Sequence, residues 1–410
     1  MTFIEYVSNL WVNLAMGLGR QLTAWGLSET LTTVIVNFVV ILVLVIVGVM
    51  TVIVFTPMER KIIARMQDRP GPNRVWPYGL TIAFADAIKM LTKELISPKN
   101  ADRLIYNAAP ILIVFRALMI YAVLPFGPPT ADAPFRLGVA DLNVGVLYFV
   151  ALGSISTIVV LMAGWGSNNK FALLGGFRVV NQLLAYEVPL ILSMLAVVVL
   201  TGTMSTQQIV DKQSIPFLLV MPVAALAFVI GSMAELNRAP FDLIEAESEL
   251  VAGYQVEYSG MRFAMFYIAE YVSMFASAVL ISTLFLGGYK FFGLENLAPV
   301  LAPFIVFGKA FFVIFCFLWF RGTFPRVRLD QLIGFAWKFL VPLSLVNLIL
   351  VAFVIKLDLP GGTWLPVVQG AVLLLGNIII LAVTFLILKR VARRSSAVPP
   401  AVRNVAAAER

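Results

Sequence analysis

The chain has 410 residues, of which 60% are hydrophobic and 13% are charged, and its formal net charge is +8. A soluble domain carries about 25% charged residues, so this composition excludes an ordinary water-soluble protein. The chain has no histidine and a single cysteine, Cys316. These counts exclude an intrachain disulfide, a cysteine metal site, and haem or metal held by histidine. Any redox centre is therefore expected on a partner.

Long apolar runs follow one another along the chain, and a helix needs about 20 such residues to cross a bilayer. The runs lie near 33–55, 104–124, 144–164, 185–202, 216–234, 263–286, 303–320, 338–356 and 366–388. They are continuous rather than alternating, which disfavours a membrane β-barrel. Residues 1–32 contain Trp11 and Trp25 and few charges, and they predict an N-terminal interfacial segment. We therefore expect an all-α polytopic transmembrane helix bundle.

The basic residues between these runs predict the orientation of the chain. Lys and Arg number 23 in five segments and only five in the segments on the opposite side. The basic segments are 56–103, 165–184, 235–262, 321–338 and 389–410. Because cytoplasmic loops are rich in Lys and Arg, we expect these segments to be inner loops, with the N-terminus outside and the C-terminus in the cytoplasm. A long basic tail without an organellar targeting signal favours a bacterial plasma membrane.

The first inner loop breaks at Pro70 and Pro72 and then predicts a helix from about Gly79 to Leu95. On this helix Asp86 and Lys89 are three residues apart and share a face. The spacing alone favours an interfacial helix with a salt-bridged polar side.

The third inner loop, AELNRAPFDLIEAESELVAGYQVEYSG, is unusually acidic for a cytoplasmic loop. Its acids are Glu235, Asp242, Glu245, Glu247, Glu249 and Glu257, against the single base Arg238. Like charges held close together raise one another's pKa, so such a cluster could hold and pass protons. Taken alone, the pattern favours a solvated acidic loop that pairs with basic surfaces of partners.

Several ionisable residues lie within the spans or at their ends, where a charge at the centre of a helix costs at least roughly 2.5–3.5 kcal/mol. They are Glu59, Arg60, Arg116, Glu187, Glu270 and Lys309. Glu187 and Glu270 favour a functional role because of their depth. For Arg116 and Lys309, structural and functional roles are equally open, and residues near span ends can also snorkel to the interface.

The fourth inner loop and its neighbours add further charges. Arg321, Arg326 and Arg328 follow a span within eight residues. These arginines mark the cytoplasmic side of the span, or they bind acidic partner subunits or lipid head groups.

Five stretches of sequence cover all four inner loops. They are ERKIIARMQDRPGPNRVWPYG, FADAIKMLTKE, GGFRVVNQLLAYEVPL, AELNRAPFDLIEAESELVAGYQVEYSGMRFAMFYIAEY and FRGTFPRVRLDQLIGFAWKFLVPLSL. In these stretches and in their order, the chain resembles the H subunit, the quinone-site membrane subunit of respiratory complex I (NADH:quinone oxidoreductase). The resemblance implies an eight-helix core over residues 33–356. The extra span at 357–388 and the basic cytoplasmic tail at 389–410 depart from that core.

The resemblance also implies a function, a substrate and partners. The family couples quinone reduction to proton translocation, with ubiquinone or menaquinone as the substrate and no haem, flavin, iron–sulfur cluster or metal bound by this membrane chain. The implied partners are peripheral subunits, including the one that carries the terminal iron–sulfur cluster, small membrane subunits, antiporter-like subunits and lipid, with no nucleic acid.

Two sets of site residues follow from matching the family's roles to these positions. The implied quinone path comprises Glu59, Arg60, Asp86, Lys89, Arg238 and Arg321. The implied proton relay comprises Glu187, Glu235, Glu245, Glu247, Glu249 and Glu270.

Three other functions remain open at this level. A standalone ion or solute transporter would favour internal pseudo-symmetry, which the sequence does not show. A membrane component of an energy-converting hydrogenase would share these loop signatures. A scaffold that only anchors a peripheral arm would leave the intramembrane carboxylates unexplained.

Overall fold

The structure is a computed structural model that describes residues 10–128, 141–242, 252–291, 293, 301–357 and 365–396. Among these residues, eight helices are long and apolar enough to cross a membrane. They are α3 (Glu29–Met66), α5 with η2 (Arg103–Val123), α6 (Gly145–Gly166), α7 (Lys170–Thr201), α12 (Gly260–Phe285), α14 (Leu301–Thr323), α15 to α16 (Leu329–Lys356) and the segment Val368–Arg390 of α17 (Leu365–Ser396). The prediction of an all-α polytopic bundle is confirmed.

Two of these helices extend well beyond the apolar runs that predicted them. α3 begins after Ser28, whose hydroxyl accepts a hydrogen bond from the Leu31 amide, and continues to Met66. α7 begins after Asn169, whose side chain accepts from the Phe171 amide, and ends at Gly202 in a left-handed conformation, which is a common way for a helix to stop. The second inner loop, expected over 165–184, is therefore mostly helix.

The span expected over 216–234 is interrupted. The chain forms a single turn, α9 (Phe217–Val220), and then α10 (Pro222–Glu235), with the non-helical residue Met221 between them. Pro222 has no amide proton to continue the hydrogen-bond ladder, so it begins the second helix. With 14 residues, α10 is about 21 Å long and too short to cross a hydrocarbon core of about 30 Å by itself.

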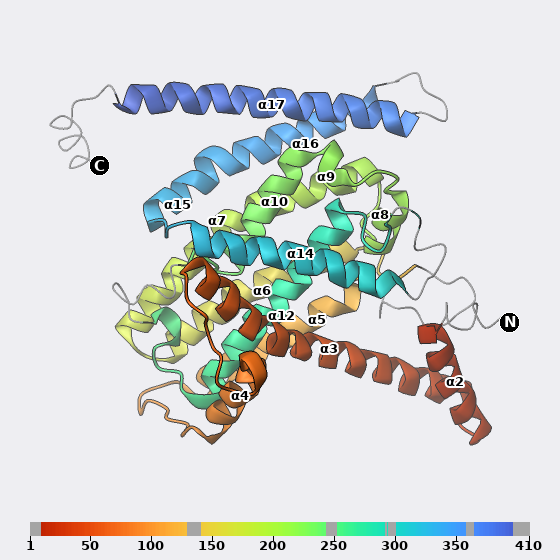
Figure 1. The fold of residues 1–410 in the computed structure, drawn as a ribbon, viewed down its shortest axis with the longest axis vertical. Helices are drawn as coiled ribbons and strands as arrows, with labels where there is room; N and C mark the ends of the chain where they lie inside the picture. Colours follow the sequence, from red (N-terminus) through yellow and green to blue (C-terminus); the bar gives the residue numbers. More distant parts are fainter. Residues whose placement is uncertain are drawn as a thin grey trace.

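α12 lies at the centre of the bundle. Every residue from Val272 to Phe285 is buried, and α12 packs against α3, α5 and α14. Short helices cover its two ends. They are α4 (Ile82–Thr92) at one end and α8 (Thr206–Lys212) at the other, on opposite sides of Figure 1. α2 (Leu10–Ala24) packs on α3 on the same side as α8.

The four predicted inner loops meet at one end of the bundle. The Asn168 side chain donates to the Asn100 carbonyl, which joins the first and second loops. The Tyr106 hydroxyl donates to the Glu257 carbonyl. The Val327 amide donates to the Pro240 carbonyl, which joins the third and fourth loops. The alternation of loops that was expected from the basic residues is thus seen in the fold.

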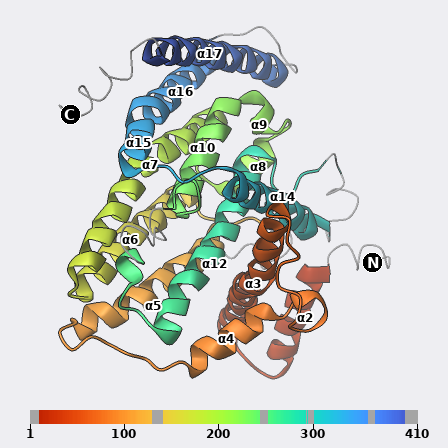
Figure 2. The ribbon, with the colours of Figure 1, turned by 60° about the vertical axis from the view of Figure 1, so that its left-hand side comes forward.

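The last helix, α17, lies along the outside of the bundle against α16 (Val341–Lys356), as Figure 2 shows. The Asn377 amide oxygen accepts a hydrogen bond of 3.3 Å from the Val223 amide at the start of α10. At Gly376, an added Cβ would lie 2.7 Å from a methyl carbon of Leu350. A small residue is therefore required for this close approach of α17 to α16.

Candidate functional site

A buried carboxylate, Glu59, ties four segments together near the end that carries the inner loops. Its side chain lies near the end of α3 and is 4% exposed. Arg238 Nη1 lies 3.0 and 3.2 Å from the two Glu59 carboxylate oxygens. Arg321 from α14 forms a second ion pair with Glu59, and the Tyr271 hydroxyl from α12 donates to Glu59 at 2.9 Å. We call Glu59, Arg238, Tyr271 and Arg321 the Glu59 cluster.

This cluster carries two guanidinium groups and one carboxylate. The Arg238 guanidinium also lies 4.7 Å from the centre of the Tyr271 ring, within the range of a cation–π contact. The resemblance placed Glu59, Arg238 and Arg321 in one path, and the structure brings all three into contact. Tyr271 was not anticipated.

A second polar group lies on α4 and is far more accessible. Arg60 Nη2 lies 2.7 Å from Asp86, and Lys89 Nζ lies 2.9 Å from the same carboxylate. Burial raises the pKa of Asp86, but the hydrogen bond from Lys89 and the charges of Arg60 and Lys89 outweigh it and bring the pKa below its ordinary value. The predicted salt-bridged side of this helix is confirmed, and it is separate from the Glu59 cluster.

A small polar cavity of about 10 Å³ adjoins the Glu59 cluster. We call it the Glu270 cavity. Its lining comprises Asn237, Arg238, Asp242, Gln255, Tyr267, Glu270 and Arg321. Asp242 is also paired with Arg326 at 3.4 Å. Glu270, expected in the proton relay, thus shares a cavity with two arginines expected in the quinone path.

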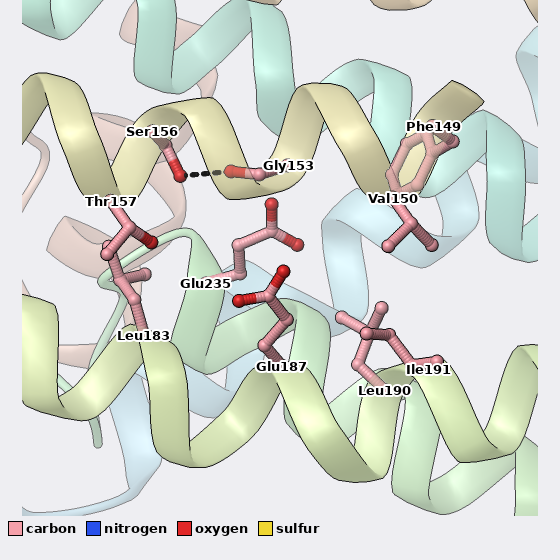
Figure 3. A pocket seen from close by; sticks show the side chains of 10 residues that line it. All are labelled: Phe149, Val150, Gly153, Ser156, Thr157, Leu183, Glu187, Leu190, Ile191 and Glu235. Carbon is pink, nitrogen blue, oxygen red and sulfur yellow. Dashed lines mark hydrogen bonds between the residues drawn. The ribbon is translucent and has the colours of Figure 1, made fainter. Parts of the chain in front are cut away.

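Glu187 and Glu235 face each other across a second cavity, of about 20 Å³, between α6, α7 and α10 (Figure 3). We call it the Glu187–Glu235 cavity. Ser154 on α6 donates a hydrogen bond to Glu187. A Cβ at Gly153 would lie 3.3 Å from a Glu235 oxygen, so the glycine leaves room for this carboxylate. The two predicted relay residues come together, and Ser154 is an addition that the sequence did not indicate.

Arg116 provides the positive charge beside this pair. It is 5% exposed, its Nη1 lies 3.7 Å from Glu235, and its Nη2 donates to the Ser273 hydroxyl on α12 at 3.3 Å. Two carboxylates and one guanidinium are electrically neutral when the carboxylates share one proton. Arg116, whose role is open from the sequence, thus lies beside Glu235 as a positive charge.

Two other charged residues have structural contacts. Lys309 Nζ donates to the carbonyls of Leu286, Gly288 and Lys290 at 2.6 to 2.8 Å, so it holds the turn after α12. The Glu257 carboxylate accepts from the Asn169 side chain at 2.6 Å. Glu245, Glu247 and Glu249 lie outside the described residues.

Known proteins match most of the chain. Residues 38–352 match the family described as NADH dehydrogenase. The chain is 45% identical over 306 residues to the H subunit of NADH-quinone oxidoreductase from Dehalococcoides mccartyi (strain CBDB1), which covers 74% of this chain and 83% of the relative. The chain belongs to the H-subunit family of NADH-quinone oxidoreductase. The H subunits of Geobacillus kaustophilus (50% over 298 residues, 72% of this chain and 87% of the relative) and Carboxydothermus hydrogenoformans (42% over 348 residues, 83% and 96%) are also similar.

Membership of the H-subunit family makes the chain a membrane component of a multisubunit oxidoreductase, and its helices make it a multi-pass membrane protein. The names of these relatives favour NADH-quinone oxidoreductase over a hydrogenase as the parent complex. The family match includes the Glu59 cluster and both cavities, whereas α17 lies beyond its last residue, 352.

Proposed function

We propose that this protein borders the quinone entry channel and chamber of the complex and couples quinone reduction to proton translocation through its interior carboxylates. The substrate of the complex is a quinone, either ubiquinone or menaquinone. The observation that carries the coupling role is the pair of Glu187 and Glu235 across a water-sized cavity, with Arg116 beside it. Two facing carboxylates repel each other when both are ionised, so this group favours holding one proton and responds to a change in charge nearby.

The Glu59 cluster supports a quinone path at the end with the inner loops. The separate and more accessible group of Arg60, Asp86 and Lys89 supplies further charged side chains along the proposed path. A negative charge that develops during quinone reduction would interact with the two guanidinium groups of the cluster. The Glu270 cavity shares Arg238 and Arg321 with that cluster, so this change in charge is expected to act on Glu270.

The proposed surroundings rest on the resemblance to the family and on the distribution of basic residues. The inner-loop end faces the cytoplasm of a bacterial plasma membrane and receives the peripheral subunits, including the one with the terminal iron–sulfur cluster. Small membrane subunits and antiporter-like subunits continue the proton path from the Glu187–Glu235 cavity. The N-terminus lies outside and the C-terminus inside.

Replacing Glu187 or Glu235 by Gln in the assembled complex tests the coupling role. We expect coupled quinone reduction and proton translocation to fall at least about tenfold, because a positioned acid or base contributes roughly 10²–10⁴-fold to proton transfer. The complex should still assemble, as judged by its protein composition and size. Glu257→Gln is the matched control, because Glu257 binds Asn169 and lines neither the Glu270 cavity nor the Glu187–Glu235 cavity. Full activity and full pumping in both variants would contradict the proposal.

A further inference from the structure

Tyr254 lies beside the Glu270 cavity without lining it. It belongs to the short helix η3 (Gly253–Gln255) and is 1% exposed. Gln255 Nε2 donates to the Tyr254 hydroxyl at 3.0 Å, and Gln255 itself lines the Glu270 cavity. One hydrogen bond therefore separates the phenol from the lining of that cavity.

The phenol also interacts electrostatically with the charged group at the other cavity. Burial raises the pKa of Tyr254, the Glu270 carboxylate raises it further, and the Arg116 guanidinium lowers it, so that the pKa remains well above its ordinary value. The hydroxyl is therefore neutral at physiological pH. The charges of Glu270 and Arg116 thus both act on the phenol. Arg116 in turn lies 3.7 Å from Glu235, which lines the Glu187–Glu235 cavity.

The position of Tyr254 is set by close backbone packing. A Cβ at Gly175 on α7 would lie 2.6 Å from the Gly253 Cα, so α7 and η3 are in direct backbone contact. The Tyr254 ring packs edge-on against Phe266, with 5.5 Å between the ring centres. These contacts hold the ring, so only the hydroxyl proton is free to change direction.

Buried donors in this region have no acceptor within the described part of the chain. The Tyr254 hydroxyl accepts from Gln255, but no described residue accepts its own proton. Arg116 Nε and Nη1 also make no hydrogen bond there. Buried polar groups are nearly always satisfied by protein or by ordered water. The volumes of about 10 and 20 Å³ are each about what one water molecule requires.

We propose that Tyr254 is the hydroxyl relay between the Glu270 cavity and the Glu187–Glu235 cavity, each of which holds an ordered water. A proton from Glu270 reaches the free lone pair of the phenol oxygen through one water. The phenol releases its own proton toward the water beside Glu235, and rotation about its C–O bond restores the starting state. One proton is transferred and the phenol is unchanged. This inference rests on the proposed coupling function.

Tyr254→Phe in the intact complex, reconstituted in vesicles, tests the relay. The variant keeps the ring and its contact with Phe266 but lacks the hydroxyl, so we expect proton translocation to fall at least about tenfold. The melting temperature should stay near that of the wild type. Tyr258→Phe is the matched control, because its hydroxyl donates to the Tyr106 carbonyl at 3.2 Å and lies outside the relay. It should translocate protons normally.

A second measurement separates proton transfer from packing. Replacing Tyr254 by 3,5-difluorotyrosine keeps the shape of the residue but makes the phenol more acidic. The translocation rate should change, whereas a tyrosine that only fills space would leave it unchanged. Normal translocation in Tyr254→Phe, with loss in Glu187→Gln and Glu235→Gln, would overturn the relay and leave the coupling function standing. Equal losses in Tyr254→Phe and Tyr258→Phe would also overturn it.

Discussion

Glu59 and Arg60 are neighbours in the sequence but belong to different interactions. Adjacent side chains on a helix point in different directions, so Glu59 faces Arg238 and Arg321, whereas Arg60 faces Asp86 on α4. Only the sequence position of both residues, at the end of the first span, follows from the pattern of charges. Their partners are separated from them by 26 to 262 residues, and a single sequence does not pair residues over such distances.

Glu59→Gln should destabilise the protein strongly. The change removes the carboxylate that pairs with the largely buried Arg238 and Arg321, and the loss of one partner from a buried ion pair costs about 3–5 kcal/mol. Arg60→Gln is the matched control, because the Arg60 side chain is 44% exposed and exposed ion pairs contribute about 0–1 kcal/mol. The purified complex is heated, and the temperature at which this chain is lost from it measures the stability of each variant. Equal shifts in the two variants would show that Glu59 is not a buried anchor.

The relay residues show the same limit of sequence reasoning. The depth of Glu187 in an apolar run indicated a functional role, whereas the acidic loop that contains Glu235, taken alone, favoured a solvated loop. Their approach across one cavity depends on how α6, α7 and α10 pack, and so does the contact of Arg116 with Glu235. The sequence did not indicate a role for Tyr254, because only its burial in the structure distinguishes it from other tyrosines.

At the scale of whole elements, hydropathy located the apolar runs but not the helix ends. The segment that extends α3 beyond its run contains Glu, Arg, Lys, Ala and Met, and the segment that extends α7 contains four leucines beside two glycines. Most of these residues are good helix formers. The backbone therefore continues as helix after the apolar residues stop. The opposite case is the run at 216–234, where composition remains apolar but Pro222 interrupts the helix.

That interruption explains how α17 is held. The start of α10 leaves the Val223 amide without a partner inside its own helix, and Asn377 supplies the acceptor. The Asn377 amide group also donates to the Leu373 carbonyl at 2.9 Å, which fixes its direction. Because the family match ends at residue 352, this contact joins a helix outside the family match to the matched part of the chain.

Asn377→Leu should weaken the docking of α17. A hydrogen bond between membrane helices contributes about 0.6–1.7 kcal/mol, enough to lower the docked fraction measurably. Cysteines at Gly370 and Val220 report docking, because a Cβ at Gly370 lies 3.7 Å from a Val220 methyl carbon. In a Cys316→Ser background, a short thiol cross-linker should join them less efficiently in the variant. Thr384→Val is the control, because the Thr384 hydroxyl donates only within α17. Unchanged cross-linking in Asn377→Leu would exclude the proposed docking contact.

At the scale of the whole molecule, the two ends of the bundle differ in charge and in content. The inner-loop end holds the Glu59 cluster, the Asp86 ion pairs and most of the basic residues, and α4 covers it. At the opposite end, the charged side chains bind neutral groups, such as Lys212 Nζ to the Thr201 carbonyl at 2.6 Å, and backbone contacts join the segments, such as the Val146 amide to the Met204 carbonyl at 2.9 Å. The sequence predicted this division, because that prediction needs only a count of the charges between spans and no knowledge of tertiary contacts.

The orientation that follows from this division can be tested by labelling single cysteines. In a Cys316→Ser background, Lys170→Cys lies at the inner-loop end and Ser214→Cys at the opposite end, and both positions are exposed. A membrane-impermeant maleimide added to intact cells should label Ser214→Cys only, and in inverted vesicles it should label Lys170→Cys only. The reason is that 23 basic residues favour the cytoplasmic side for the inner-loop end. The reversed pattern would place the proposed quinone path on the outer surface, away from any cytoplasmic peripheral arm. Labelling of both cysteines in both preparations would contradict the separation of the two ends by a membrane.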